Sequence, residues 1–224
     1  SSLHKRKRPK PMNARPEVVE GVAEKTGAPN ATGPNFIQGA LSYRLRLQQA
    51  LDLIPLQPVE ELAHALLSAW QDKRQVFLFG NGGSAANANH IANDMIYGVS
   101  KQFGHALRVN ALSANTAVLT CLANDEGYDS IYVRQLAVLA NPGDIVIALS
   151  GSGNSPNIVK ALQWCREQAI QSFAVLGYTG GKAKDLAHCP IHVPVDDMQI
   201  SEDLQLVVGH MAMQWLYEQR ASAG

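Results

Sequence analysis

The sequence has few cysteines and no membrane-spanning apolar run. Cys121, Cys165 and Cys189 are widely spaced and odd in number, and no Cys-x-x-Cys pair occurs. This pattern favours reduced thiols and a cytoplasmic location over a disulfide-bonded protein. No apolar run reaches the length of a membrane span and no signal peptide is recognised, so we expect a soluble protein.

The chain also lacks net charge. Lys+Arg and Asp+Glu both number 19, so no overall field attracts it to nucleic acid or anionic lipid. The local exception is the basic run from His4 to Lys10, which indicates either a nucleic-acid or targeting tail or a disordered leader before Met12. Residues 1–34 are predicted to be a flexible arm or an expression remnant, and residues 35–224 one domain.

Short apolar runs rich in β-forming residues alternate with helical patterns. Strands are predicted at 75–79, 106–112, 145–149, 172–177 and 191–195, the last at a sheet edge because it contains Pro194. Helices are predicted at 36–53, 58–73, 85–95, 116–123, 128–140, 156–169, 182–187 and 202–218. The alternation predicts an α/β fold, a five-stranded parallel sheet with helices on both faces. The two leading helices are extra to it and offer a surface for oligomerisation.

A glycine turn joins the first predicted strand to a helix. Gly80-Asn-Gly-Gly-Ser84 is neither Gly-x-Gly-x-x-Gly nor a Walker loop, because it lacks the third glycine and the Lys-Ser/Thr pair. Ser84 suits a helix N-cap. A strand, a glycine turn and a helix N-terminus together favour anion binding, although such a turn is often only a turn.

A second loop of the same form follows the third predicted strand. Ser150-Gly-Ser-Gly-Asn-Ser155 offers the hydroxyls of Ser150, Ser152 and Ser155 at a strand's carboxyl end, where ligands bind in open α/β sheets. Hydroxyl and amide donors without an obligatory cation suit a small phosphomonoester. The alternative is a capped turn whose serines bond only to the backbone.

Four ionisable side chains are candidates for chemistry. His90 and Asp94 are four residues apart on one helix and share a face, and Glu202 and His210 belong to the last helix. They could act as acid and base or bind Zn²⁺. The alternatives are ordinary structural histidines and a simple i,i+4 pair. By spacing alone, Asp203 aligns with His210 better than Glu202 does.

Three segments carry a resemblance to a known family. Gly80-Asn-Gly-Gly-Ser84, Ser150-Gly-Ser-Gly-Asn-Ser155 and Ala123-Asn-Asp-Glu-Gly127 resemble signatures of the sugar isomerase (SIS) domain, and with His90 and His210 those of the phosphoheptose isomerases. The resemblance covers about residues 36–216. It implies a homotetramer with active sites at subunit interfaces, zinc near the reacting carbons, and an aldose–ketose isomerase acting on sedoheptulose 7-phosphate through an enediol.

The resemblance also implies roles for individual residues. His90 falls on a metal ligand, Asp94 on a glutamate that binds metal and acts as base, Glu202 on a usual glutamine, and His210 on an acid and ligand. Asp94 and Glu202 both remain candidates for the base. Ala114 stands where the family has a further acidic residue. The substrate and phosphate contacts implied are Asn81, Gly82, Gly83, Ser84, Asn124, Asp125, Ser150, Ser152 and Ser155.

Two other functions stay open. Ser84-Ala-Ala-Asn-Ala88 also looks like the replication-initiator-associating SIS proteins, which favours a non-catalytic module that binds a sugar phosphate or a protein partner. An SIS isomerase of another phosphosugar would differ only in the shape of its pocket.

Overall fold

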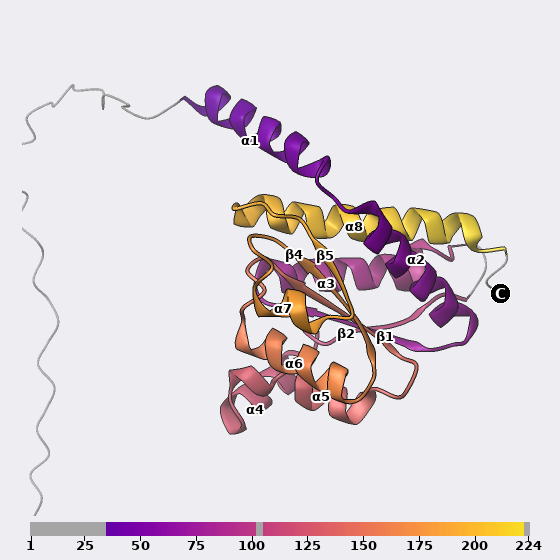
Figure 1. Cartoon of the computed structure of the whole chain (residues 1–224). Coiled ribbons are helices and arrows are strands. Elements are labelled where there is room, and N and C mark those ends of the chain that lie inside the picture. Colours follow the sequence, from indigo (N-terminus) through magenta and orange to yellow (C-terminus); the bar gives the residue numbers. More distant parts are fainter. Residues whose placement is uncertain (1–34, 102–104, 222–224) are drawn as a thin grey trace, which may run out of the picture.

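The computed structural model describes residues 35–101 and 105–221. Its centre is a five-stranded, all-parallel sheet in the order β2-β1-β3-β4-β5 (Figure 1). The strands are β1 (Gln75–Gly80), β2 (Arg108–Ala111), β3 (Ile145–Ser150), β4 (Gln171–Leu176) and β5 (Cys189–His192). The predicted fold class is confirmed. The arm predicted for residues 1–34 lies outside the described residues.

Helices cover both faces of the sheet. The helices are α1 (Phe36–Leu51), α2 (Leu56–Gln71), α3 (Gly83–Asn93), the π-helical turn η1 (Asp94–Gly98), α4 (Thr116–Asp125), the 3-10 turn η2 (Tyr128–Ser130), α5 (Val133–Leu139), α6 (Pro156–Glu167), α7 (Gly181–Leu186) and α8 (Met198–Gln219). In Figure 1, α2, α3 and α8 lie on one side of the sheet, and α4, α5 and α6 lie on the other.

Strand alternation divides the core in two. Along β1, Val76 and Leu78 pack with α2, α3 and α8, whereas Phe77 and Phe79 pack with α5 and α6. All four side chains are almost completely buried. Successive side chains of a strand point to opposite faces, so an uninterrupted apolar run is what a sheet covered on both faces requires.

Several predicted boundaries are corrected by local chemistry. The fifth strand is Cys189–His192 rather than 191–195, so it is an edge strand that contains Pro190 and ends before Pro194. The predicted helix at 128–140 is divided into η2 and α5, and α4 continues to Asp125. The last helix starts at Met198, not Glu202, because the Asp197 side chain accepts a hydrogen bond from Ile200 N–H and caps it.

The leading helix α1 is attached to the body along one face only. Tyr43 and Leu47 pack against the core, and the Tyr43 hydroxyl donates a hydrogen bond to Asp203 on α8. Burial, together with the bond to Asp203, raises the pKa of Tyr43 to about 12, so the phenol stays neutral near pH 7. Figure 1 shows α1 projecting beyond the other helices.

Candidate active site

The two loops singled out in the sequence meet at one point of the sheet. We call residues 80–84 the glycine loop and residues 150–155 the serine loop; they follow the adjacent strands β1 and β3. The chain leaves β1 toward α3 on one face and β3 toward α6 on the other. In a sheet of order 2-1-3-4-5 this is the topological switch point, where a crevice outside the strand ends receives ligands.

Amide side chains join the glycine loop to the first turn of α6 across the switch point. Asn81 and Asn157 exchange two hydrogen bonds, of 2.9 and 2.8 Å between amide nitrogen and amide oxygen. The Tyr128 hydroxyl donates to the same Asn81 oxygen at 3.1 Å, and the buried Tyr132 hydroxyl donates to the Gly80 carbonyl. Burial raises the pKa of Tyr132, which keeps it a hydrogen-bond donor. The amide nitrogen and oxygen of Asn81 are therefore both used in hydrogen bonds within the protein.

The glycine loop is closed by α8. Gly82 has a φ of +55° and is the N-cap of α3, so Ser84 is not the cap that the sequence predicted. Ser84 is only 4% exposed, and its hydroxyl accepts a 2.9 Å hydrogen bond from Gln205 Nε2. A Cβ on Gly83 would overlap the Glu202 carboxylate, which lies against the first turn of α3. A carboxylate of the chain itself thus faces this helix N-terminus, as the helix dipole favours.

The serine loop is more open. Ser150 Oγ accepts from Gly153 N–H at 3.1 Å, and Ser152 Oγ accepts from Asn154 N–H at 3.3 Å. Ser155 precedes α6 at the N-cap position without making a side-chain cap bond, and Ser152 and Ser155 are partly exposed. Partly exposed hydroxyls beside the N-terminus of α6 suit an oxyanion.

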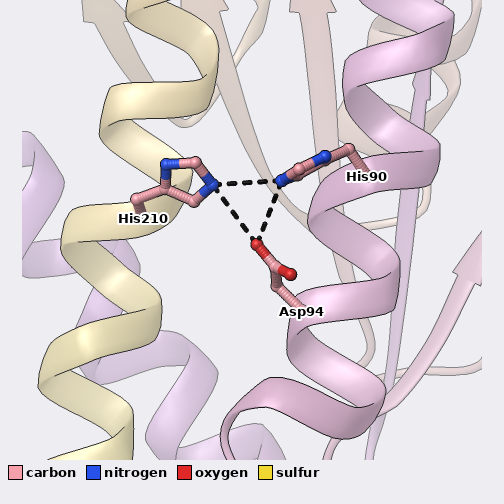
Figure 2. A group of neighbouring side chains, drawn as sticks. All are labelled: His90, Asp94 and His210. Carbon is pink, nitrogen blue, oxygen red and sulfur yellow. Dashed lines mark hydrogen bonds and ion pairs between the residues drawn. The ribbon is translucent and has the colours of Figure 1, made fainter.

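Three of the four ionisable candidates converge between α3 and α8 (Figure 2). His90 Nε2 and His210 Nε2 are 3.1 Å apart, and each lies 3.3 Å from Asp94 Oδ2. The side chains of His90 and His210 are 51% and 41% exposed, whereas that of Asp94 is 19% exposed. The group is therefore anchored at the carboxylate and accessible at the imidazoles.

Close helix packing produces this convergence. His90, near the end of α3, and Asp94, the first residue of the π-helical turn η1 that continues it, are four residues apart and share a face. Val99 N–H bonds to the Asp94 carbonyl in that turn. Gly209 precedes His210 and lets α8 approach, because a Cβ there would stand 2.8 Å from Ile91. The distance between His90 and His210 thus depends on the absence of a side chain at position 209.

Glu202 does not join this group. Among the described residues, ligand atoms within 4.8 Å of one another come from His90, Asp94 and His210. Glu202 lies two turns earlier on α8, beside Gly83, and its carbonyl accepts a 2.9 Å hydrogen bond from Asn87. Asp203, which the sequence spacing aligned with His210, instead accepts a hydrogen bond from the Tyr43 hydroxyl.

Comparison with known proteins agrees with this architecture. The SIS domain family matches residues 44–177, which is more than half of the chain. The chain belongs to the SIS domain family. Its curated relatives include the phosphoheptose isomerase of Trichlorobacter lovleyi, which is 35% identical over 179 residues covering 79% of this chain and 90% of that protein. The phosphoheptose isomerase of Aquifex aeolicus is 35% identical over 162 residues, covering 72% and 84%.

Solved structures give the same result. The phosphoheptose isomerase of Neisseria gonorrhoeae superposes with a TM-score of 0.72 at 27% identity, covering 80% of this chain and 96% of that one. The predicted SIS fold and the relationship to phosphoheptose isomerases are confirmed, and with them the predicted enzyme class, an aldose–ketose isomerase. No helix among the described residues is long and apolar enough to cross a membrane.

The third SIS signature lies apart from these contacts. Asn124 and Asp125 occupy the exposed last turn of α4, where Asn124 donates a 2.7 Å hydrogen bond to Asp125. Ala114 is exposed just before α4. No hydrogen bond joins Asn124 or Asp125 to either loop among the residues that the structure describes, so their part in substrate binding stays a prediction.

Sequence reasoning missed the polar residues that support the site. Asn157, Tyr128, Asn87 and Gln205 hold the loops and join α3 to α8. Only Asn157, directly after the proline that starts α6, had a positional signal. Gln205 is 1% exposed, and a buried amide of that kind has no sequence signature apart from its helical face.

Proposed function

We propose that the protein interconverts sedoheptulose 7-phosphate and D-glycero-D-manno-heptose 7-phosphate by proton transfer through an enediol. The observation that carries this is the convergence of His90, Asp94 and His210 within 3.3 Å, on helices that begin beside the switch point. The relatives named phosphoheptose isomerase support the substrate class. The enzyme is proposed to be cytoplasmic; the three cysteines, free in the described residues, are consistent with that.

The phosphate is proposed to bind at the serine loop, through Ser150, Ser152 and Ser155 beside the N-terminus of α6. The glycine loop, residues 81–84, would then contact the sugar, because a carboxylate already faces its helix N-terminus and its serine is bonded to Gln205. Six residues separate Ser84 from His90, about 9 Å along α3 at 1.5 Å per residue. We propose that the sugar extends from the loops along α3, so that its carbonyl end meets the imidazoles.

Asp94 is proposed as the base and His210 as the acid. Isomerisation needs one group to take a proton from the carbon beside the carbonyl and another to protonate the oxygen. Asp94 and His210 are 3.3 Å apart and can serve adjacent atoms, whereas Glu202 lies beside Gly83. Asp94 is the better-shielded member of the group, which holds the base in one position while the partly exposed His210 meets the substrate.

The same three residues fit Zn²⁺, and we propose one ion per active site. With zinc held by His90 Nε2, His210 Nε2 and Asp94 Oδ2, the base would be the other Asp94 oxygen and the acid the other His210 nitrogen. Two imidazole nitrogens and a carboxylate oxygen are ligands that zinc prefers, and bonds of about 2.0–2.1 Å in a tetrahedral site place ligand atoms roughly 3.3 Å apart. The observed separations are 3.1–3.3 Å. When bound, zinc would stabilise the negative charge that develops on the enediol oxygens. Glu202 would need to leave Gly83 to become a fourth ligand.

The experiment is an isomerase assay on purified protein. Sedoheptulose 7-phosphate should give the aldose heptose 7-phosphate, detected by mass-balanced chromatography. Metal content is measured on the same sample by elemental analysis, and activity is followed after chelation and zinc return. No turnover with or without zinc would contradict the proposed activity. Turnover of a different phosphosugar alone would keep the reaction type and reject the heptose.

A homotetramer is proposed for the assembly, with α1 as a contact surface. Ile37, Leu41 and Leu45 are 63%, 49% and 56% exposed on the side of α1 that faces away from Tyr43 and Leu47. A helix apolar on both sides is normally buried on both sides. The leading helix therefore has a second apolar face for another copy of the chain to cover.

A further inference from the structure

Three residues other than glycine have a positive φ in the part of the chain that the structure describes. They are Lys73 (φ 56°), Ala169 (φ 54°) and Tyr178 (φ 44°). Lys73 and Ala169 end helices: in each case the next residue donates its N–H to a carbonyl five residues back. A left-handed residue is usual in that helix-ending motif. Tyr178 ends no helix, and its backbone needs another explanation.

Tyr178 is the second residue of a turn after β4. Gly180 N–H donates to the Gly177 carbonyl at 2.8 Å and closes the turn. Turns with a positive φ at this position normally have glycine there, and a bulky residue is a real outlier. Two bonds hold the conformation: Tyr178 N–H donates to the Val195 carbonyl at 3.0 Å, and His192 Nε2 donates to the Tyr178 carbonyl at 2.9 Å.

The turn packs directly on the serine loop. Gly177 N–H donates to the Gly151 carbonyl at 2.9 Å. A Cβ placed on Gly151 would lie 2.6 Å from Met198 Sδ and 3.8 Å from Tyr178 Cε2. The thioether of Met198 and the ring of Tyr178 thus both border the serine loop at Gly151. The Tyr178 hydroxyl makes no hydrogen bond to any residue among those described, and Tyr178 is partly exposed.

We propose that Tyr178 is a specificity-determining residue of the phosphosugar site. Its ring and Met198 form a wall for the sugar carbons next to the phosphate, and its hydroxyl bonds to a sugar hydroxyl. An aromatic ring with a polar end supplies both contacts from one side chain. This role explains why a bulky residue occupies a backbone position suited to glycine, since such strain is concentrated at ligand sites. The inference rests on the proposed placement of the phosphate at the serine loop.

The test compares Tyr178→Gly and Tyr178→Phe with Lys73→Gly, a control that changes another left-handed residue at a helix end. Binding of sedoheptulose 7-phosphate and of inorganic phosphate is measured by calorimetry, beside KM, kcat and Tm. Tyr178→Gly should keep Tm within about 3 °C, since glycine suits the turn. Tyr178→Gly should weaken sugar-phosphate binding and raise KM about tenfold or more. Tyr178→Phe should change both quantities in the same direction by a smaller factor. Inorganic phosphate should bind both variants within about twofold of wild type, and Lys73→Gly should match wild type throughout.

Three results would overturn the role. One is unchanged binding of sedoheptulose 7-phosphate by Tyr178→Gly. Another is an equal loss of sugar phosphate and inorganic phosphate accompanied by a fall in Tm, which would make the residue structural. The third is a wild-type protein that binds no sedoheptulose 7-phosphate. A wild type that binds it without turnover would refute the proposed activity alone, because the calorimetric comparison would still decide the role of Tyr178.

Discussion

The Nε2 atoms of His90 and His210 are 3.1 Å apart, so a hydrogen atom or a cation must lie between them. Two protonated nitrogens at this distance would repel, and so would two lone pairs, whereas one proton or one cation satisfies both. The Asp94 oxygen 3.3 Å from each nitrogen adds negative charge at the same point. The arrangement of charges therefore favours a proton or a metal ion at this point. The proposed acid–base step uses the first, and the proposed zinc site uses the second.

Replacing His210 with alanine should remove activity without removing the fold. His210 is 41% exposed at its side chain, so its loss leaves no large cavity in the core. Loss of a general acid typically costs about 10²–10⁴ in rate, and kcat should fall by that amount. Binding of inorganic phosphate should stay unchanged, because the serine loop is intact. The measurement is kcat beside phosphate calorimetry.

His64→Ala is the matched control for that variant. His64 is an exposed histidine on α2, in ring contact with Trp215 and outside the His90, Asp94 and His210 group. Its kcat should equal that of wild type. If His210→Ala kept full turnover, the acid would have to be another residue; if wild type had no turnover at all, a non-catalytic SIS module would be favoured.

The sequence predicted the members of this group, His210 through the family resemblance, but not the packing that brings them together. His90 and Asp94 follow from i,i+4 spacing, which is local. The approach of His210 depends on which face of α8 meets α3, and therefore on Gly209 fitting against Ile91. Glu202 was displaced for the same reason: the rotation that brings His210 to His90 brings Glu202 to Gly83. Contacts between helices distant in sequence are set by packing, which has no local signature.

At the scale of elements, apolar runs predicted the strands better than they predicted helix ends. β1 and β3 were found nearly to the residue because both are buried on two faces. The strand order and the switch point could not be predicted, since they depend on which strands pair. Helix starts depended on caps: α8 begins one turn before the predicted position because Asp197 supplies the cap. Its first turn also carries Met198, which borders the serine loop.

Asp197 should stabilise α8 in a pH-dependent way. Its hydrogen bond from Ile200 N–H, followed by its bond to Arg46, holds the pKa of its carboxyl below its usual range. A carboxyl whose pKa is lower in the folded state stabilises the fold above its unfolded pKa and loses that contribution as pH falls through the folded value. Asp197→Ala should lower the free energy of unfolding by about 1 kcal/mol at pH 7, the usual cost of an N-cap.

Asp197→Asn separates the cap from the charge. Asparagine still caps a helix, so this variant should lose only the exposed pairing with Arg46, roughly 0–1 kcal/mol. Urea unfolding of wild type and both variants between pH 3 and 7 is the measurement. The difference between wild type and Asp197→Asn should shrink below about pH 4. A difference that grew as pH fell would contradict the assignment of the carboxylate as the stabilising form.

At the scale of the whole molecule, α1 exposes several large apolar side chains to solvent. Phe36, at the start of α1, and Leu56, at the start of α2, are 84% and 67% exposed, and Ile37, Leu41 and Leu45 on α1 are also exposed. Exposed apolar side chains along the outer side of a projecting helix, here called the outer stripe (Ile37, Leu41 and Leu45), indicate an interaction surface. Because α1 is joined to the body through Tyr43, Arg46 and Leu47, the outer stripe can bind another copy without unfolding the inner contacts.

We therefore expect charge in the stripe to change the assembly. Wild type should have a mass four times that of the chain by light scattering, and the double variant Leu41→Glu, Leu45→Glu should form smaller species, because burying two carboxylates between apolar faces is strongly unfavourable. Gln49→Glu, an exposed position on α1 beside the stripe, adds charge without removing an apolar contact and should keep the wild-type mass. An unchanged mass for the double variant would exclude α1 as the contact.

Activity measured on the smaller species then decides whether the site needs a neighbouring subunit. Full turnover would mean that His90, Asp94, His210 and the two loops of one chain suffice.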